Sequence, residues 1–315
     1  MNGVIATVSE IAKTKIGYDI AFPNIGIFIT NLRNTIHIGN FTIAYYGIII
    51  AIGMLIAFTI VTRLSKKLGI NDDIFYDIFI IVIVFGIIGA RAYYVIFRWD
   101  YYQIRPYEIL DIRAGGLAVF GGILLAGTAI VIYSLWKKIN FLKVLDLTMI
   151  GVTIGQAIGR YGNFFNMEAF GEYTNNLLAM RLRMEYLDSS NITFLQSLNT
   201  ITEDGIEYIQ AHPTFFYEST LNLILFFILI YIILKKHIFD GQILATYLIG
   251  YGVIRFFVES LRTDSLMIGA FKVSQIVAIL CIIAGAIIYI LHFKKVKPFV
   301  KVEKIDKSMK KAKGE

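Results

Sequence analysis

The chain has 315 residues, 57% of them hydrophobic, and a mean hydropathy of +0.67. Soluble domains are typically about 45–50% apolar, so this composition excludes an ordinary water-soluble fold and indicates an integral membrane protein. The formal net charge of +7 does not indicate nucleic-acid binding, because much of it lies in one lysine-rich tail, residues 294–315. A single cysteine, Cys281, excludes an internal disulfide.

Seven apolar runs are candidates for membrane-spanning helices, because about 20 apolar residues cross a ~30 Å hydrocarbon core. In chain order they cover residues 41–62, 74–97, 117–136, 144–165, 215–234, 243–258 and 268–293. The predicted fold class is therefore an all-α integral membrane protein, a bundle of seven transmembrane helices with a small cap outside the membrane.

Lysine and arginine in the short connections predict the orientation of this bundle. Basic residues follow the first run, flank the connection between the third and fourth runs, and follow the fifth and seventh runs. These connections lie on one side, which the excess of positive charge identifies as the cytoplasm. We therefore expect a multi-pass protein with its N-terminus outside and its C-terminus in the cytoplasm.

Three parts follow from this topology. They are an extracytoplasmic segment at residues 1–40, a membrane domain at 41–293 and a basic cytoplasmic tail at 294–315. The longest polar segment, at about 172–211, is predicted to form an extracytoplasmic cap of mixed structure. The tail either contacts an anionic membrane leaflet or is solvated and only fixes the orientation.

Polar side chains interrupt the apolar runs, and the topology places all of them toward the outer ends. They are Arg91, Arg113, Arg160, Asn163, Asn166, Glu168, His212, Glu218, Arg255, Glu259, Arg262 and Asp264. An arginine in hydrocarbon costs about 2.5–3.5 kcal/mol on insertion scales, so such residues usually face the bundle interior and mark a site. The alternative is that they snorkel to the interface, above all Arg113 and Arg262 near the ends of their runs.

Helical spacing predicts that several of these groups share one site. Arg255, Glu259 and Arg262 are spaced to lie on one helix face, and Arg160 lies three residues before Asn163. Glycines 159 and 162 bracket Arg160 and permit close approach of a neighbouring backbone, whereas Gly127 is expected to serve only tight helix packing.

Several arginines at one depth favour binding of a phosphate, since a guanidinium is permanently charged and matches phosphate oxygens in pairs. A lipid phosphodiester is the anion expected at that depth. The sequence has no HExxH, P-loop or GxSxG motif and no Cys/His cluster with metal-binding spacing, so neither a metal site nor a cofactor is predicted.

The segment GRYGNFFNMEAFG, residues 159–171, resembles the signature GR-x-GNF-x-N-x-E-x-x-G of the prolipoprotein diacylglyceryl transferases. The resemblance continues, in the family's order, through YYG, GARAYYVIF, GGLAVFGG, HPT-x-x-YE and RFF-x-E-x-LRTDSL. It implies a seven-helix enzyme of the bacterial cytoplasmic (inner) membrane. Such an enzyme transfers the diacylglyceryl group of phosphatidylglycerol to the lipobox cysteine thiol of a preprolipoprotein, forming a thioether and releasing glycerol phosphate.

The resemblance also implies roles for individual residues. Tyr46, Arg160, Asn163, Arg255 and Glu259 are the expected catalytic residues. Substrate binding is expected at Arg160, Arg91, Glu168, Gly171, Arg262, His212 and Arg113. The expected partners are phosphatidylglycerol and lipobox signal peptides, with no nucleic acid.

Three of these motifs depart from the family pattern. Many members have histidine where this chain has Phe120, which leaves the general base unidentified; Met167 and the pair Phe215 and Phe216 affect packing more than chemistry. We expect His212 to cap the fifth helix and solvent to take the thiol proton. Two other functions stay open, a lipid or solute transporter and a catalytically silent relative that binds lipid or signal peptides.

Overall fold

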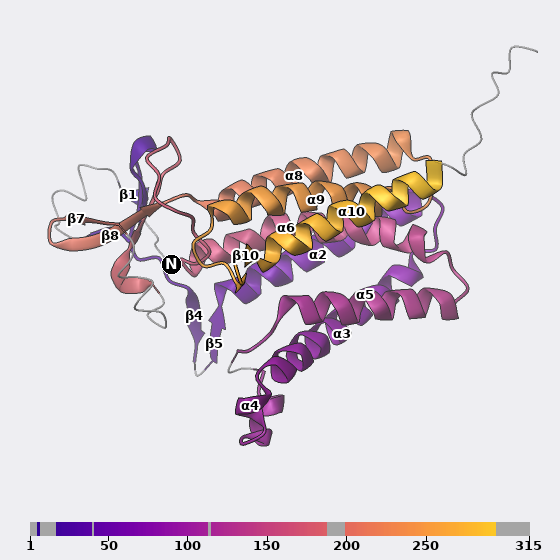
Figure 1. Cartoon of the computed structure of the whole chain (residues 1–315), viewed down its shortest axis with the longest axis horizontal. Helices are drawn as coiled ribbons and strands as arrows, with labels where there is room; N and C mark the ends of the chain where they lie inside the picture. Colours follow the sequence, from indigo (N-terminus) through magenta and orange to yellow (C-terminus); the bar gives the residue numbers. More distant parts are fainter. Residues whose placement is uncertain (1–4, 7–16, 40, 113–114, 188–198, 294–315) are drawn as a thin grey trace, which may run out of the picture.

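The computed structural model describes residues 5–6, 17–39, 41–112, 115–187 and 199–293. A bundle of long helices makes up most of this part, and a β-sheet lies at one end of it (Figure 1). We call this end the sheet end. The lysine-bearing connections after α2, between α5 and α6 and after α8 lie at the opposite end.

Seven of the described helices are long and apolar enough to cross a membrane, as predicted. They are α2 (Tyr45–Lys67), α3 (Asp73–Phe97), α5 (Val119–Trp136), α6 (Phe141–Phe165), α8 (Thr214–Tyr231, continued by a π-helical turn at Ile232–Lys236), α9 (Gln242–Leu261) and α10 (Val273–Phe293). Shorter elements are α4 (Trp99–Tyr102) and the 3-10 helices Pro23–Ile25, Pro106–Leu110 and Met184–Tyr186.

Two predicted helix starts are wrong. Phe41–Ala44 forms strand β5, which pairs with β4 (Thr35–Ile38) in a hairpin that turns at Gly39. The last run begins with a second hairpin, β9 (Met267–Ile268) and β10 (Phe271–Lys272), which turns at Gly269. Both glycines have positive φ, the conformation that tight turns require, so the chain reverses there before each helix begins.

The sheet joins two segments that are far apart in the sequence. Its strand order is β1 (Ile5–Ala6), β3 (Ile27–Ile29), β2 (Ile20–Phe22), β6 (Met180–Arg183), β8 (Ile206–Ala211) and β7 (Thr200–Glu203), with antiparallel pairing throughout. Ile20 lies opposite Leu182, and both are fully buried. The cap therefore contains strands of residues 1–40 as well as strands of the 172–211 insert.

Packing ties the sheet to the membrane helices. Ile20, Leu182 and Ile209 form a buried cluster with Phe170, which follows α6, and Phe215, in the first turn of α8. A second buried core holds α2, α6, α8 and α9 together, with members that include Leu147, Ile150, Leu229 and Ile243. Helices α6 and α8 are therefore fixed at the sheet end by the first cluster and farther from the sheet by the second core.

Helices α3 and α5 form a hairpin beside the bundle (Figure 1). They cross at Gly89 and Gly121, where a Cβ atom on either residue would collide with the other glycine's carbonyl. Gly127 was expected to serve tight packing, but a Cβ there would meet no atom within 4 Å. That expectation is wrong, because the close contact lies nearer the start of α5.

Candidate active site

A buried carboxylate links two arginines from different helices at the sheet end. Glu218 on α8 is 2% exposed, and each of its two carboxylate oxygens contacts a different arginine. Its Oε1 lies 2.5 Å from Nη2 of Arg160 on α6, and its Oε2 lies 3.1 Å from Nη1 of Arg255 on α9. One glutamate thus holds two guanidinium groups close together, with α6, α8 and α9 as the frame.

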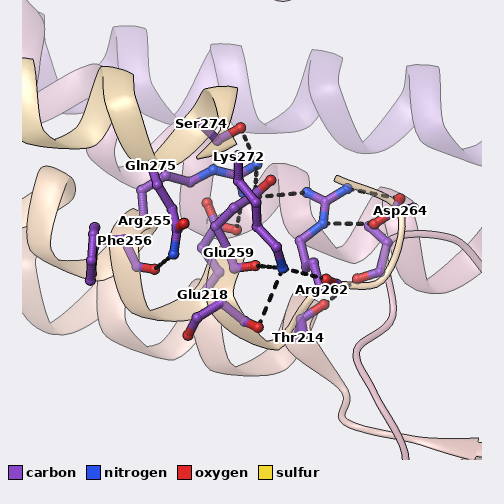
Figure 2. A network of polar contacts seen from close by, with 12 residues as sticks. Thr214, Glu218, Arg255, Phe256, Glu259, Arg262, Asp264, Lys272, Ser274 and Gln275 are labelled. Atoms are coloured by element: carbon purple, nitrogen blue, oxygen red, sulfur yellow. Dashed lines mark hydrogen bonds and ion pairs between the residues drawn. The ribbon is translucent and has the colours of Figure 1, made fainter. Parts of the chain in front are cut away.

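The predicted face of α9 is present. Arg255 Nη2 lies 2.6 Å from Oε2 of Glu259, one turn further along, and Arg262 Nη1 lies 4.0 Å from the same oxygen. Arg262 also forms a two-point ion pair with Asp264, at 3.0 and 2.9 Å. Figure 2 shows Arg255, Glu259 and Arg262 following one another along α9, with Glu218 on the facing helix. Spacing alone correctly predicted this group.

Lys272 closes the end of α9. Its Nζ donates to the carbonyl oxygens of Glu259 at 2.8 Å and Arg262 at 2.7 Å (Figure 2). The last carbonyls of a helix have no partner within the helix and carry partial negative charge, so a cation there stabilises the end. The backbone N–H of Glu172 donates to another carbonyl of this helix end, Leu261 O, at 2.8 Å. These contacts fix the position of Glu259 and Arg262.

Gly171 has to be small at this junction. Its backbone pairs with Arg262 in an isolated β-bridge, and its N–H donates to His212 O at 3.0 Å. A Cβ at residue 171 would lie 2.8 Å from Leu261 O and from the His212 Cβ. The glycine therefore lets the loop after α6 lie directly across the end of α9.

A second branch of the site runs from α6 toward α2. Arg160 Nη1 donates to Asn163 Oδ1 at 3.3 Å, and Asn163 Nδ2 donates to Glu168 Oε1 at 2.8 Å. The Tyr46 hydroxyl faces the Asn163 side chain. The Tyr46 ring lies against Gly162, where a Cβ would be 2.6 Å from a ring carbon. Arg160, Asn163, Glu168 and Tyr46 are thus brought together as predicted.

Both central arginines keep donors for a further ligand. A guanidinium has five N–H donors. Within the described residues, Arg160 donates two hydrogen bonds, to Glu218 and Asn163, and Arg255 donates two, to Glu218 and Ser274, besides its ion pair with Glu259. Their side chains are 22% and 14% exposed. The arrangement can therefore bind an anion that approaches from the partly open side.

Arg91 lies outside this cluster. Its guanidinium donates to the carbonyls of Ile109 at 2.8 Å, Glu108 at 2.6 Å, Gly115 at 2.8 Å and Gly116 at 3.0 Å. It therefore holds together the connection between α4 and α5, and its substrate-binding role stays a prediction. Arg113 lies outside the described residues.

His212 does not cap α8 with its side chain. The N-cap position is Pro213, and the imidazole Nδ1 instead lies 3.3 Å from the Tyr217 hydroxyl. The capping interpretation is therefore wrong. Burial lowers the pKa of His212 below its usual 6.5, while the nearby Glu172 carboxylate acts in the opposite direction. Phe120, at the position where the family often has histidine, lies in the first turn of α5 and is 39% exposed.

A cavity of about 620 Å³ adjoins the cluster, between the sheet and the end of α9. Arg262, Lys272, Gly171 and Glu172 line it on the membrane side, and Gln210 of β8 lines it on the other. Among the described residues, no group of three or more His, Cys, Asp or Glu side chains is placed to hold a metal ion.

Sequence reasoning did not assign Glu218 or Lys272 to the site. Glu218 was noted as a polar residue within an apolar run, but its bridging role depends on α6, α8 and α9 being neighbours. The segment HPT-x-x-YE, which contains Glu218, was the signal that could have identified it. Lys272 lies inside the last predicted span, 268–293, and nothing in its local sequence indicates that it folds back onto α9.

Comparison with known proteins identifies the family. Residues 33–291 match the family model described as prolipoprotein diacylglyceryl transferase. This chain belongs to that family. A relative from Finegoldia magna is 43% identical over 254 residues, which cover 81% of this chain and 93% of the relative. It is named phosphatidylglycerol--prolipoprotein diacylglyceryl transferase.

Two further relatives have the same name. One, from Bacillus cytotoxicus, is 40% identical over 263 residues, covering 83% of this chain and 92% of the relative. Another, from Clostridium novyi, is 41% identical over 248 residues, covering 79% and 91%. The family match includes the ion cluster and all seven long helices except the last two residues of α10.

Proposed function

We propose that this chain transfers the diacylglyceryl group of phosphatidylglycerol to the lipobox cysteine thiol of preprolipoproteins, the first step of bacterial lipoprotein maturation. The names of its relatives and the family match over residues 33–291 support this reaction. The protein is thus a transferase whose lipid substrate comes from the membrane and whose second substrate is a signal peptide. No cofactor enters the scheme.

The observation that carries the proposal is the bridge from Arg160 through Glu218 to Arg255. The thiolate attacks the glyceryl carbon bonded to the phosphate oxygen, the carbon–oxygen bond breaks, and its electron pair leaves with glycerol phosphate. Negative charge therefore increases on a phosphate oxygen during the reaction. Two arginines fixed by a buried carboxylate form a preorganised site for that charge. The Arg160 and Arg255 donors that make no contact with the described residues would bind the phosphodiester.

The neighbouring residues would position this pair. Glu259 orients Arg255 through the 2.6 Å ion pair, and Asn163 links Arg160 to Glu168 at the mouth of the site. Tyr46 would contact the same substrate from α2. Arg262 and Gly171 would form the outer wall, beside the cavity that faces the sheet.

Proton removal from the thiol would use solvent. A free cysteine has a pKa of about 8.5, and nearby cations lower it. Phe120 has no lone pair to accept a proton. The arginine cluster would favour the thiolate electrostatically, and the rate would then rise with pH through the lowered thiol pKa. His212 would not act as the base.

The sheet end would lie outside the cytoplasmic membrane of the bacterium, with the N-terminus outside and the C-terminus inside. The lysine-bearing connections at the opposite end support this orientation. The test is labelling of cysteines placed at Glu172 and at Lys138, using an impermeant thiol reagent on intact cells in a Cys281→Ser background. We expect labelling at 172 and protection at 138, and the reverse pattern would contradict the orientation.

The function is tested with purified protein in lipid nanodiscs that contain phosphatidylglycerol. A peptide with a lipobox cysteine should gain the mass of one diacylglyceryl group, and the linkage should resist alkaline hydroxylamine, as a thioether does. A cysteine-to-serine peptide and nanodiscs of phosphatidylethanolamine are the controls. Binding of the peptide and lipid without any product would instead favour the silent relative, for which Phe120 is the supporting observation.

A further inference from the structure

A second layer of polar side chains lies one helical turn beyond the ion cluster, away from the sheet. Gln156 precedes Arg160 by four residues on α6, and Asn222 follows Glu218 by four on α8. Residues four apart on a helix lie one above the other. Because α6 runs toward the sheet and α8 runs away from it, these two amides lie at the same level.

Three atoms of this layer have no hydrogen-bond partner among the described residues. Asn222 is 0% exposed, and both its Oδ1 and its Nδ2 are unpaired; the buried Oε1 of Gln156 is unpaired as well. The Nε2 of Gln156 donates to the Tyr247 hydroxyl at 3.0 Å. A buried polar group without a hydrogen bond is costly, above all within a membrane bundle.

Neighbouring buried hydroxyls are satisfied by the protein itself. Thr153 on α6 donates to Met149 O at 2.7 Å, and Ser219 on α8 donates to Ala157 O at 2.7 Å. Within the described residues of α6 and α8, the buried side-chain atoms without a hydrogen-bond partner all belong to Gln156 and Asn222. They indicate a ligand that both donates and accepts hydrogen bonds.

We propose that Asn222 and Gln156 bind water, and that this water positions Glu218. Asn222 offers a donor and an acceptor together, and a water molecule satisfies both while making about three hydrogen bonds in total. Each carboxylate oxygen of Glu218 accepts from one arginine and has a further lone pair. A water held by Asn222 can donate to that lone pair and so fix the carboxylate from the side opposite the substrate.

Asn222 is thus a positioning residue, and its effect on catalysis rests on the proposed function. It does not touch the substrate. It acts on the bound water, the water acts on Glu218, and Glu218 acts on the two arginines. Without the water, Glu218 would be held by the arginines alone and would move when a phosphate competes for their donors. The consequence falls on the chemical step more than on substrate binding, so kcat should change more than KM.

The test compares Asn222→Leu, Asn222→Ser and the control Thr153→Val in phosphatidylglycerol nanodiscs. The leucine cannot bind water, and we expect kcat to fall about tenfold or more with little change in KM. The serine hydroxyl can still hold water and should restore most of the loss. Thr153→Val removes a hydroxyl already satisfied within α6 and should retain wild-type kcat. Wild-type kcat in Asn222→Leu, or serine no better than leucine, would overturn the positioning role.

A structure of the wild-type protein in lipid, at a resolution that shows ordered water, tests the binding itself. We expect density within hydrogen-bond distance of both Asn222 amide atoms and of Glu218. A direct amide pair between Asn222 and Gln156, or a lipid hydroxyl in that position, would overturn the water site. This measurement does not depend on turnover, so it separates failure of the water site from failure of the proposed transferase activity.

Discussion

The ring of Tyr46 occupies the space that a side chain on residue 162 would need. A Cβ on Gly162 would lie 2.6 Å from one ring carbon and 2.9 Å from another. The glycine therefore brings α2 against α6 and places the Tyr46 hydroxyl beside Asn163. The second glycine of the segment GRYGNF thus has a defined structural purpose, which is to admit an aromatic ring next to the site.

Gly162→Ala should therefore displace Tyr46. Overpacking of this kind costs about 1–3 kcal/mol of stability, and a shift of about 1 Å at a site can lower the rate about 10²-fold. Thioether formation and the thermal midpoint are the measurements. Gly155→Ala on the same helix is the control, because a Cβ there meets nothing within 4 Å. Equal behaviour of the two variants would show that the contact with Tyr46 is unimportant.

Glu218→Gln should be among the most damaging single changes in the bundle. It leaves two guanidinium groups facing one neutral amide in a site where the original side chain is 2% exposed. Breaking a buried ion pair by removing one partner typically costs about 3–5 kcal/mol. Glu259→Gln removes the close partner of Arg255 and only a 4.0 Å contact with Arg262, so it should cost less. The free energy of chemical unfolding in detergent and the turnover rate would be measured for both variants. A milder effect at 218 than at 259 would contradict the bridging role.

His212 predicts a dependence of stability on pH. Because burial lowers its pKa below 6.5, the folded chain favours the neutral imidazole. As the pH falls through about 6.5, the unfolded chain binds the proton first, so the fold loses stability toward acid. The measurement is the melting temperature of the wild type minus that of His212→Gln. This difference should decrease as the pH is lowered from 8 to 5.

The same variant tests proton removal. If solvent takes the thiol proton, the pH–rate profiles of the wild type and His212→Gln should have the same shape and rise toward the thiol pKa. An ionisation below pH 6.5 that appears in the wild type and disappears in His212→Gln would identify His212 as the base and contradict this account.

The hairpin of α3 and α5 depends on two glycines. Gly121→Ala would insert a methyl group where Gly89 and the side chain of Tyr93 already lie, so the hairpin should open at a cost of about 1–3 kcal/mol. Gly127→Ala, which has free space, should be neutral. Protease protection of the two variants in nanodiscs compares them, and comparable loss in both would show that the crossing is not the determinant.

The sequence predicted what depends on local spacing. Arg255, Glu259 and Arg262 repeat at helical intervals, and Arg160 and Asn163 do so as well, so the intervals alone place each group on a shared face. The seven spans follow from apolar length. Two helix starts were wrong because short strands at 41–44 and 267–272 are as apolar as a helix, and only their pairing distinguishes them.

Features that depend on distant parts of the chain were not predictable. The role of Glu218 requires α8 to pack against both α6 and α9, and the sheet requires Ile20 to meet Leu182 across 162 positions. Arg91 is a further case: the sequence indicated a buried arginine, but its backbone partners in the connection between α4 and α5 could not be predicted. A charged residue within an apolar run indicates that it has partners, but the sequence does not identify those partners.

The most direct measurement for the central claim is the turnover of Arg160→Lys and Arg255→Lys with phosphatidylglycerol and a lipobox peptide. Lysine keeps the charge but loses the planar guanidinium, whose several N–H donors can bind Glu218 and the phosphate at the same time. Loss of one such preorganised donor lowers kcat by about 10²–10³-fold, and we expect a reduction of this order in each variant. Near-normal turnover in either lysine variant would contradict the claim that two guanidinium groups, held together by Glu218, stabilise the departing phosphate.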